Sequence, residues 1–137
     1  MARPIKSIIR FLSEAEVIAI NEEMVAKFGG LHGVKDLHML RLAVGRPQMS
    51  VGFQDAYKTI FDKAAAMFHS IINNHPFLDG NKRTSLFSAI LFLERNGWSV
   101  EFRRKEAVKF TRRAHNEDYT TEQISKWLKV TSVKIST

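Results

Sequence analysis

The sequence predicts an all-α protein, in which a single domain forms a bundle of about six helices around one buried central helix. Apolar residues recur at helical spacing through most of the 137 residues, and only two short stretches look extended or loop-like. A hydrophobic content of 45% is enough for one core at this length, without disulfides or a structural metal. We expect the domain to span residues 1–137, with the core at about 11–130 and a short flexible C-terminal tail.

The first two helices are marked by their ends. Residues 13–16 read Ser-Glu-Ala-Glu, the form of a capping box, and an apolar stripe follows until Gly29 and Gly30 stop it. Asp36 is placed to cap a short second helix that ends near Gly45. These signals predict two helices before the middle of the chain.

Four further helices follow from the apolar pattern. Residues 58–74 carry one broad apolar stripe, whereas residues 84–96 are apolar on nearly every side, which predicts the buried centre of the bundle. Residues 105–115 and 121–130 make two more helices. Between them, residues 98–102 alternate between apolar and polar and form either a short strand or a connector.

The segment most informative about function is residues 75–84, which read HPFLDGNKRT and join the third and fourth predicted helices. His75 has a side chain that titrates near neutral pH and could remove a proton from a hydroxyl group. Asp79 is a hard oxygen ligand of the kind that holds Mg²⁺ together with substrate phosphates. Gly80 permits a positive φ and a close approach of backbone to ligand.

The remaining residues of this segment favour a bound anion. Lys82 and Arg83 can neutralise phosphate charge, and two cations at the positive end of a helix dipole are unfavourable unless an anion binds there. Asn81 can both donate and accept a hydrogen bond, and Phe77 would anchor the loop in the core. We assign the catalytic role to His75, Asp79, Lys82 and Arg83, the metal to Asp79, and nucleotide binding to Phe77, Gly80, Asn81, Lys82, Arg83 and Thr84.

The order of these residues resembles the Fic/Doc family. The Fic branch carries HPFxxGNGRxxR, and the Doc (death on curing) branch carries a shorter form that ends in Asn-Lys-Arg, as HPFLDGNKRT does here. The resemblance covers roughly residues 11–128. It also includes Doc-like segments at 28–30, 33–36, 46–48, 61–66 and 92–97, and Leu40.

The resemblance implies a Fic/Doc-type bundle and a nucleotide-dependent transferase that uses ATP and Mg²⁺. Lys82 and Leu86 stand where Fic enzymes have a glycine and an arginine that hold the nucleotide for AMP transfer. We therefore expect a Doc-type toxin of a toxin-antitoxin system, which phosphorylates a serine or threonine of a translation factor such as elongation factor Tu and blocks translation. A Fic-type adenylyltransferase is the alternative. A non-catalytic module that binds phosphate, nucleotide or nucleic acid is a third hypothesis.

Two further expectations follow from the resemblance. In relatives, the region equivalent to residues 45–57 forms a flap that can hold a target segment by main-chain pairing, although a plain surface loop is equally consistent with this sequence. No glutamate has Ser or Thr four positions earlier, so the inhibitory helix of self-restrained Fic enzymes is missing. We expect restraint in trans, by an antitoxin segment that folds into a groove.

Charge and composition limit the remaining possibilities. The net charge of +7 is partly clustered at residues 103–105 and 112–113, which we interpret as a solvated helix face. No zinc-finger spacing or RNA-recognition signature is present, so we expect no direct nucleic-acid binding. The chain has no cysteine, no apolar run long enough to span a membrane, and too short and charged a start at residues 1–11 for a secretory signal. These features predict a cytoplasmic protein.

Overall fold

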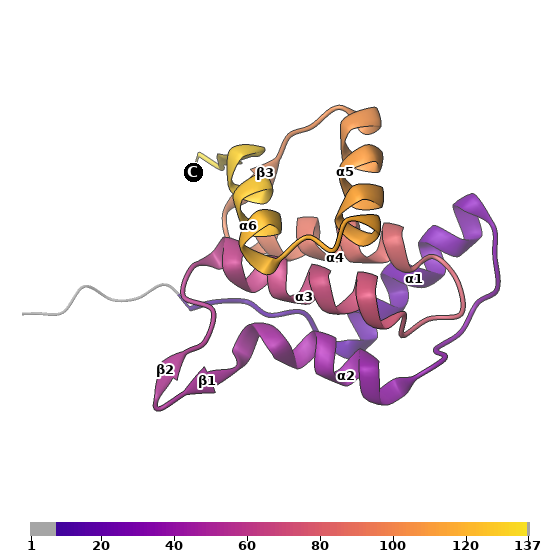
Figure 1. Cartoon of the computed structure of the whole chain (residues 1–137), viewed down its shortest axis with the longest axis horizontal. Coiled ribbons are helices and arrows are strands. Elements are labelled where there is room, and N and C mark those ends of the chain that lie inside the picture. The colour runs from indigo at the N-terminus through magenta and orange to yellow at the C-terminus, as the bar shows by residue number, and fades with distance from the viewer. Residues whose placement is uncertain (1–7, 137) are drawn as a thin grey trace, which may run out of the picture.

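The computed structural model describes residues 8–136. Most of residues 1–11, which the sequence predicts not to be a secretory signal, lie outside the described residues. Within residues 8–136 the fold is all-α, as predicted (Figure 1). Its six helices are α1 (Glu14–Phe28), α2 (Leu37–Gly45), α3 (Ile60–Asn74), α4 (Asn81–Arg95), α5 (Arg104–Asn116) and α6 (Thr121–Val130). A short 3₁₀ helix, η1 (Arg46–Gln48), follows α2 directly.

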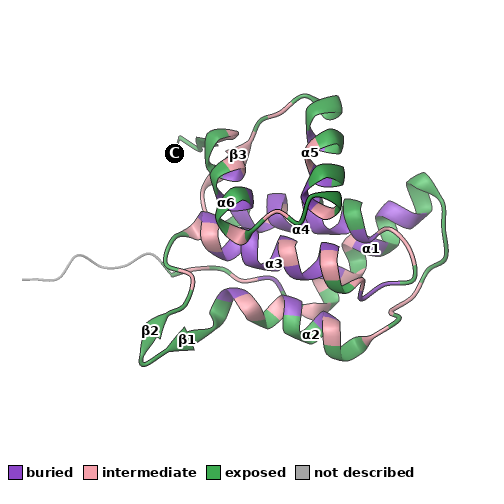
Figure 2. Ribbon diagram, in the orientation of Figure 1, coloured by how far each residue is buried: buried purple, intermediate pink, exposed green. Residues whose placement is uncertain are grey.

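Helices α3 and α4 form the centre of the bundle together. They pack against each other, α2 and α6 cover α3, and α1 and α5 cover α4. Figure 2 shows the buried positions concentrated along these two helices. The predicted central helix, α4, is not enclosed on every side, because Phe87 is 39% exposed, whereas Phe68 and Ile71 of α3 are fully buried.

The predicted caps form. The Ser13 hydroxyl accepts a hydrogen bond from the Glu16 amide and Glu16 returns one, and Asp36 accepts from the Met39 amide. The predicted start of the fourth helix was wrong, because α4 begins at Asn81 and not near residue 84. Gly80 caps it in the left-handed region at φ +77, so the last part of the HPFLDGNKRT segment forms the first turn of α4.

Two small antiparallel sheets complete the fold. Strands β1 (Ser50–Val51) and β2 (Gln54–Asp55) form a hairpin, and β3 (Trp98–Val100) pairs with β4 (Ser132–Lys134). The prediction of a flexible tail after residue 130 was therefore wrong for these residues. Alternating β-branched side chains and a free edge of β3 favour pairing there. Among the described residues, no helix has both the length and the apolarity to cross a membrane.

Candidate active site

The loop between α3 and α4, residues 75–80, is fixed by main-chain hydrogen bonds to the loop that precedes α2. His75 ends α3 in the left-handed region at φ 47. The Pro76 carbonyl accepts from the amides of Lys35 and Asp36 at 2.8 and 3.0 Å, and the Leu78 amide donates to the Gly33 carbonyl at 3.0 Å. A backbone pairing outside any regular helix or sheet therefore holds the predicted catalytic loop.

Asn81 closes the same loop from inside. Its Oδ1 accepts from the Phe77 amide at 3.0 Å, and its Nδ2 donates to the Phe77 carbonyl at 2.9 Å. Phe77 itself is 1% exposed and anchors the loop in the core, as predicted. The side chains of Phe77, Asn81 and Thr84, three of the predicted nucleotide-binding residues, thus lie on the buried side of the loop.

Asn21 of α1 links the loop to the first turn of α4. Its Nδ2 donates to the Asp79 carbonyl at 2.8 Å and to the Thr84 Oγ1 at 3.1 Å, and its side chain is 1% exposed. The sequence analysis did not single out Asn21. A signal was present, because Asn21 lies at helical spacing from the buried Val17 and Val25, and a polar residue on an apolar stripe needs a partner.

One oxygen of Asp79 is occupied and the other is free. Oδ2 accepts from the Leu31 amide at 2.7 Å, whereas no described residue donates to Oδ1. The backbone of Gly30 passes so close that a Cβ there would lie 2.8 Å from the Asp79 Cβ. Among residues 8–136, no three His, Asp or Glu side chains gather as a complete metal site. Asp79 therefore fits a cation that takes most of its ligands from substrate phosphate and water.

A hollow of about 300 Å³ opens above the loop and the start of α4. The amides of Asn81, Lys82 and Arg83 have no hydrogen-bond acceptor within the described chain, as is usual in the first turn of a helix. Lys82 and Arg83 are exposed and have no carboxylate partner in residues 8–136. Free amides, a helix N-terminus and two cations are groups that favour anions, in agreement with the anion site expected from the sequence. The lining of the hollow comprises His75, Leu78, Asp79, Gly80, Asn81, Lys82 and Arg83.

His75 lies at the edge of this hollow in an environment that favours its neutral form. Partial burial lowers the pKa of His75, and the positive charges of His115, Lys35 and Lys82 lower it further. The His115 ring of α5 packs on the His75 ring, with centroids 5.2 Å apart. The lowered pKa favours the neutral imidazole, which is the form that a general base requires. His115 was not predicted, because its contact with His75 arises only from the packing of distant segments.

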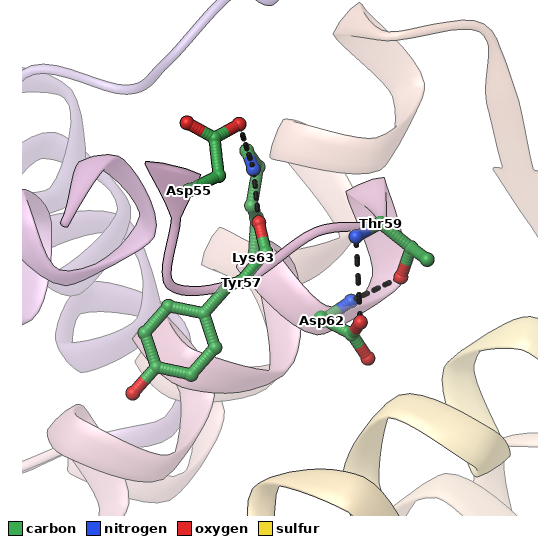
Figure 3. Close-up of polar contacts among 5 residues, drawn as sticks. All are labelled: Asp55, Tyr57, Thr59, Asp62 and Lys63. Carbon is green, nitrogen blue, oxygen red and sulfur yellow. Dashed lines mark hydrogen bonds and ion pairs between the residues drawn. The ribbon is translucent and has the colours of Figure 1, made fainter. Parts of the chain in front are cut away.

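The β1–β2 hairpin forms within residues 45–57, the region expected to be either a flap or a surface loop. Lys63 of α3 binds its base (Figure 3), and the hairpin lies at the opposite end of α3 from the catalytic loop (Figure 1). Lys63 is 2% exposed, and its Nζ donates to Asp55 Oδ2 at 3.1 Å and to the Tyr57 carbonyl. Arg46 donates to the Tyr57 hydroxyl at 2.7 Å and to the Ser70 hydroxyl at 3.0 Å. The flap therefore has an ordered base, and Phe53 at its tip is fully exposed.

Comparison with known proteins places this fold and site in a family. The model of the Fic/DOC family matches residues 11–93, and the chain belongs to this family. Toxin Doc of Mycolicibacterium smegmatis is 49% identical over 70 residues, which are 51% of this chain and 54% of that relative. Protein kinase doc of Escherichia phage P1 is 36% identical over 92 residues, or 67% of this chain and 72% of the phage protein.

The names of these relatives agree with the resemblance seen in the sequence, which pointed to the Doc branch. The chain spans about half the length of the mycobacterial relative that it matches. The match to the family model includes the whole HPFLDGNKRT segment and the loop that supports it.

Proposed function

We propose that the chain is a cytoplasmic Doc-type toxin that transfers the γ-phosphate of ATP to a serine or threonine hydroxyl of a protein involved in translation, such as elongation factor Tu. The observation that carries the proposal is the combination of a neutral His75 with an anion site at the start of α4. A site for anions alone would not require a base beside it. The printed names of the relatives, a toxin and a protein kinase, support the same activity.

The proposed reaction gives a role to His75, Asp79, Lys82 and Arg83. His75 takes the proton of the attacking hydroxyl, the hydroxyl oxygen bonds to the γ-phosphorus, and ADP leaves with the electron pair of the broken P–O bond. Lys82, Arg83 and the free amides of α4 stabilise the charge on the phosphate oxygens, which is the main requirement of phosphoryl transfer. Mg²⁺, held by Asp79 Oδ1, would neutralise charge on the bound ATP.

Two substitutions relative to Fic enzymes favour phosphate transfer over AMP transfer. Lys82 adds bulk and charge at a position where a glycine would let the backbone approach the nucleotide. Leu86 is 6% exposed, so its side chain packs in the core and offers no bidentate clamp for phosphate. Protein adenylylation is the alternative outcome of the experiment below.

We further propose that restraint comes from an antitoxin in trans. An apolar groove of about 350 Å³ runs between α1 and α4, and Phe28 and Phe87 on its rim are partly exposed. Its largely apolar lining suits one face of an amphipathic helix, the predicted form of the antitoxin segment.

The test is transfer of label from ATP to protein. The chain and its His75→Ala variant are incubated with bacterial lysate, Mg²⁺ and ATP labelled at the γ- or the α-phosphate. We expect label on a protein band from γ only and a loss of about 10²- to 10⁴-fold in the variant, the usual contribution of a positioned base. Label from α would establish an adenylyltransferase, and binding of ATP without any transfer would favour the non-catalytic hypothesis.

A further inference from the structure

One face of α5 carries only cations and an apolar residue, and it continues onto the first turn of α4. Its charged members have no carboxylate within ion-pair distance anywhere in residues 8–136. The neighbouring Arg113 differs, because its Nε pairs with Glu117 at 2.6 Å. We call this face the basic trough, and it comprises Lys82, Arg83, Arg104, Lys105, Val108, Lys109 and Arg112.

The basic trough is concave and leads to the candidate active site. Two hollows of about 200 and 590 Å³ lie along it and share Val108 and Arg112. The smaller hollow also shares Lys82 and Arg83 with the hollow above the catalytic loop. Val108 lies between the cations and is 46% exposed, so the trough combines charge with an apolar contact point.

Like charges at successive turns of a helix repel one another and destabilise it. The sequence analysis interpreted residues 103–105 and 112–113 as a solvated face, but such a face usually interleaves both signs. Here the cations converge on concave surface next to the catalytic loop. A bound polyanion would relieve the repulsion.

We propose that the basic trough is the docking surface for an acidic polypeptide segment with an apolar side chain that covers Val108. The proposal concerns binding and is independent of the transfer reaction. The cations provide charge complementarity, which guides association and fixes register. Val108 supplies exposed apolar area that a sugar-phosphate backbone would not use.

Two features favour a polypeptide over a nucleic acid. Among the described residues, no aromatic side chain lines either hollow of the basic trough, and aromatic rings are the usual stacking platforms for bases. The stripe from Arg104 to Arg112 is also short. The eight residue steps from Arg104 to Arg112, at a helical rise of about 1.5 Å, span roughly 12 Å. A stripe of this length can contact a few acidic side chains, whereas a specific nucleic-acid interface usually buries about 1,000 Å² or more of protein surface.

The test compares Arg112 with Arg113, two adjacent arginines of the same helix. A labelled ten-residue peptide of glutamates with one central leucine, and a single-stranded RNA of about 20 nucleotides, are titrated with the protein by fluorescence anisotropy at two salt concentrations. We expect Arg112→Gln to weaken peptide binding about threefold or more, and Arg113→Gln to change it less than twofold. Val108→Ser should also weaken binding, whereas Val133→Ser, at a valine outside the trough that is 51% exposed against 46% for Val108, should not.

Three results would overturn the proposal. They are equal losses for Arg112→Gln and Arg113→Gln, tighter binding of the RNA through the same residues, and no binding of the peptide by the unmodified protein. The substituted arginines lie on the surface, and circular dichroism would verify that each variant is folded.

Discussion

Replacement of Gly30 by alanine tests whether the loop before α2 controls the active site. Gly30 has φ +113, and an added Cβ would lie 2.8 Å from the Asp79 Cβ, whereas ordinary contacts begin near 3.4 Å. Asp79 would therefore have to move by about 0.6 Å, the difference between these two distances. A shift of this size would disturb the 2.7 Å hydrogen bond that the Leu31 amide donates to Asp79 Oδ2.

Two energies add in this variant. An L-residue in the left-handed region costs about 1–3 kcal/mol, and loss of a hydrogen bond to a charged acceptor costs about 1.5–3 kcal/mol. We expect the free energy of unfolding to fall by about 2.5–6 kcal/mol in total. The matched control is Gly29→Ala, because Gly29 also has a positive φ, +90, but no atom lies within 4 Å of its added Cβ. The control should lose only the backbone part, about 1–3 kcal/mol.

Urea unfolding gives the stabilities, and calorimetric titration with ATP and Mg²⁺ gives the affinities. If Gly30 acts through Asp79, the affinity for ATP in the presence of Mg²⁺ should fall at least fivefold in Gly30→Ala. In Gly29→Ala the same affinity should stay within twofold of that of the unmodified protein. Equal affinities in the two variants would refute the reasoning, because the strain would then be confined to the backbone of the loop.

Three other predictions concern the flap, the base and the anion site. Lys63→Met should lower the free energy of unfolding by about 1–3 kcal/mol, because the Tyr57 carbonyl loses its donor, and should speed amide exchange in the flap hairpin. Lys58→Met, at an exposed neighbour, should change neither the stability nor the exchange. The lowered pKa of His75 means that transfer should persist at pH values below 6.5. His115→Phe removes a positive neighbour, so the pKa of His75 should rise and the acidic limb of the rate profile should move to higher pH. Lys82→Ala should raise the free energy of unfolding by about 0.3–1 kcal/mol, because the variant lacks a cation at the positive end of α4. The same variant should transfer phosphate more slowly. A lower free energy of unfolding would contradict the proposed effect of the helix dipole.

The helices were predictable because their signals are local. Ser13, Glu16 and Asp36 form the caps expected of them, and the spacing of apolar residues located all six helices. The start of α4 was missed because Asn-Lys-Arg has no helix signal of its own. Gly80 supplies the cap through its backbone conformation, and the Asn81 side chain bonds back to Phe77.

Contacts between distant segments were not predictable from one sequence. Asn21 reaches across from α1 to Asp79, and the Leu31 amide comes from a loop 48 residues away from the carboxylate that it meets. The pairing of β4 with β3 likewise depends on where α6 ends in space. Periodicity reports which face of an element is buried, but not which partner covers it.

The HPFLDGNKRT segment divides into two groups with different physical tasks. Phe77, Asn81 and Thr84 face inward and use their polar atoms within the protein, so substituting them removes buried hydrogen bonds or packing. His75, Lys82 and the free Asp79 Oδ1 face the hollow. Charges gathered there are unfavourable in the empty site and become favourable when an anion binds. The inward group must therefore hold the loop in place against this repulsion, which explains why so many main-chain and amide hydrogen bonds surround a loop of six residues, 75–80.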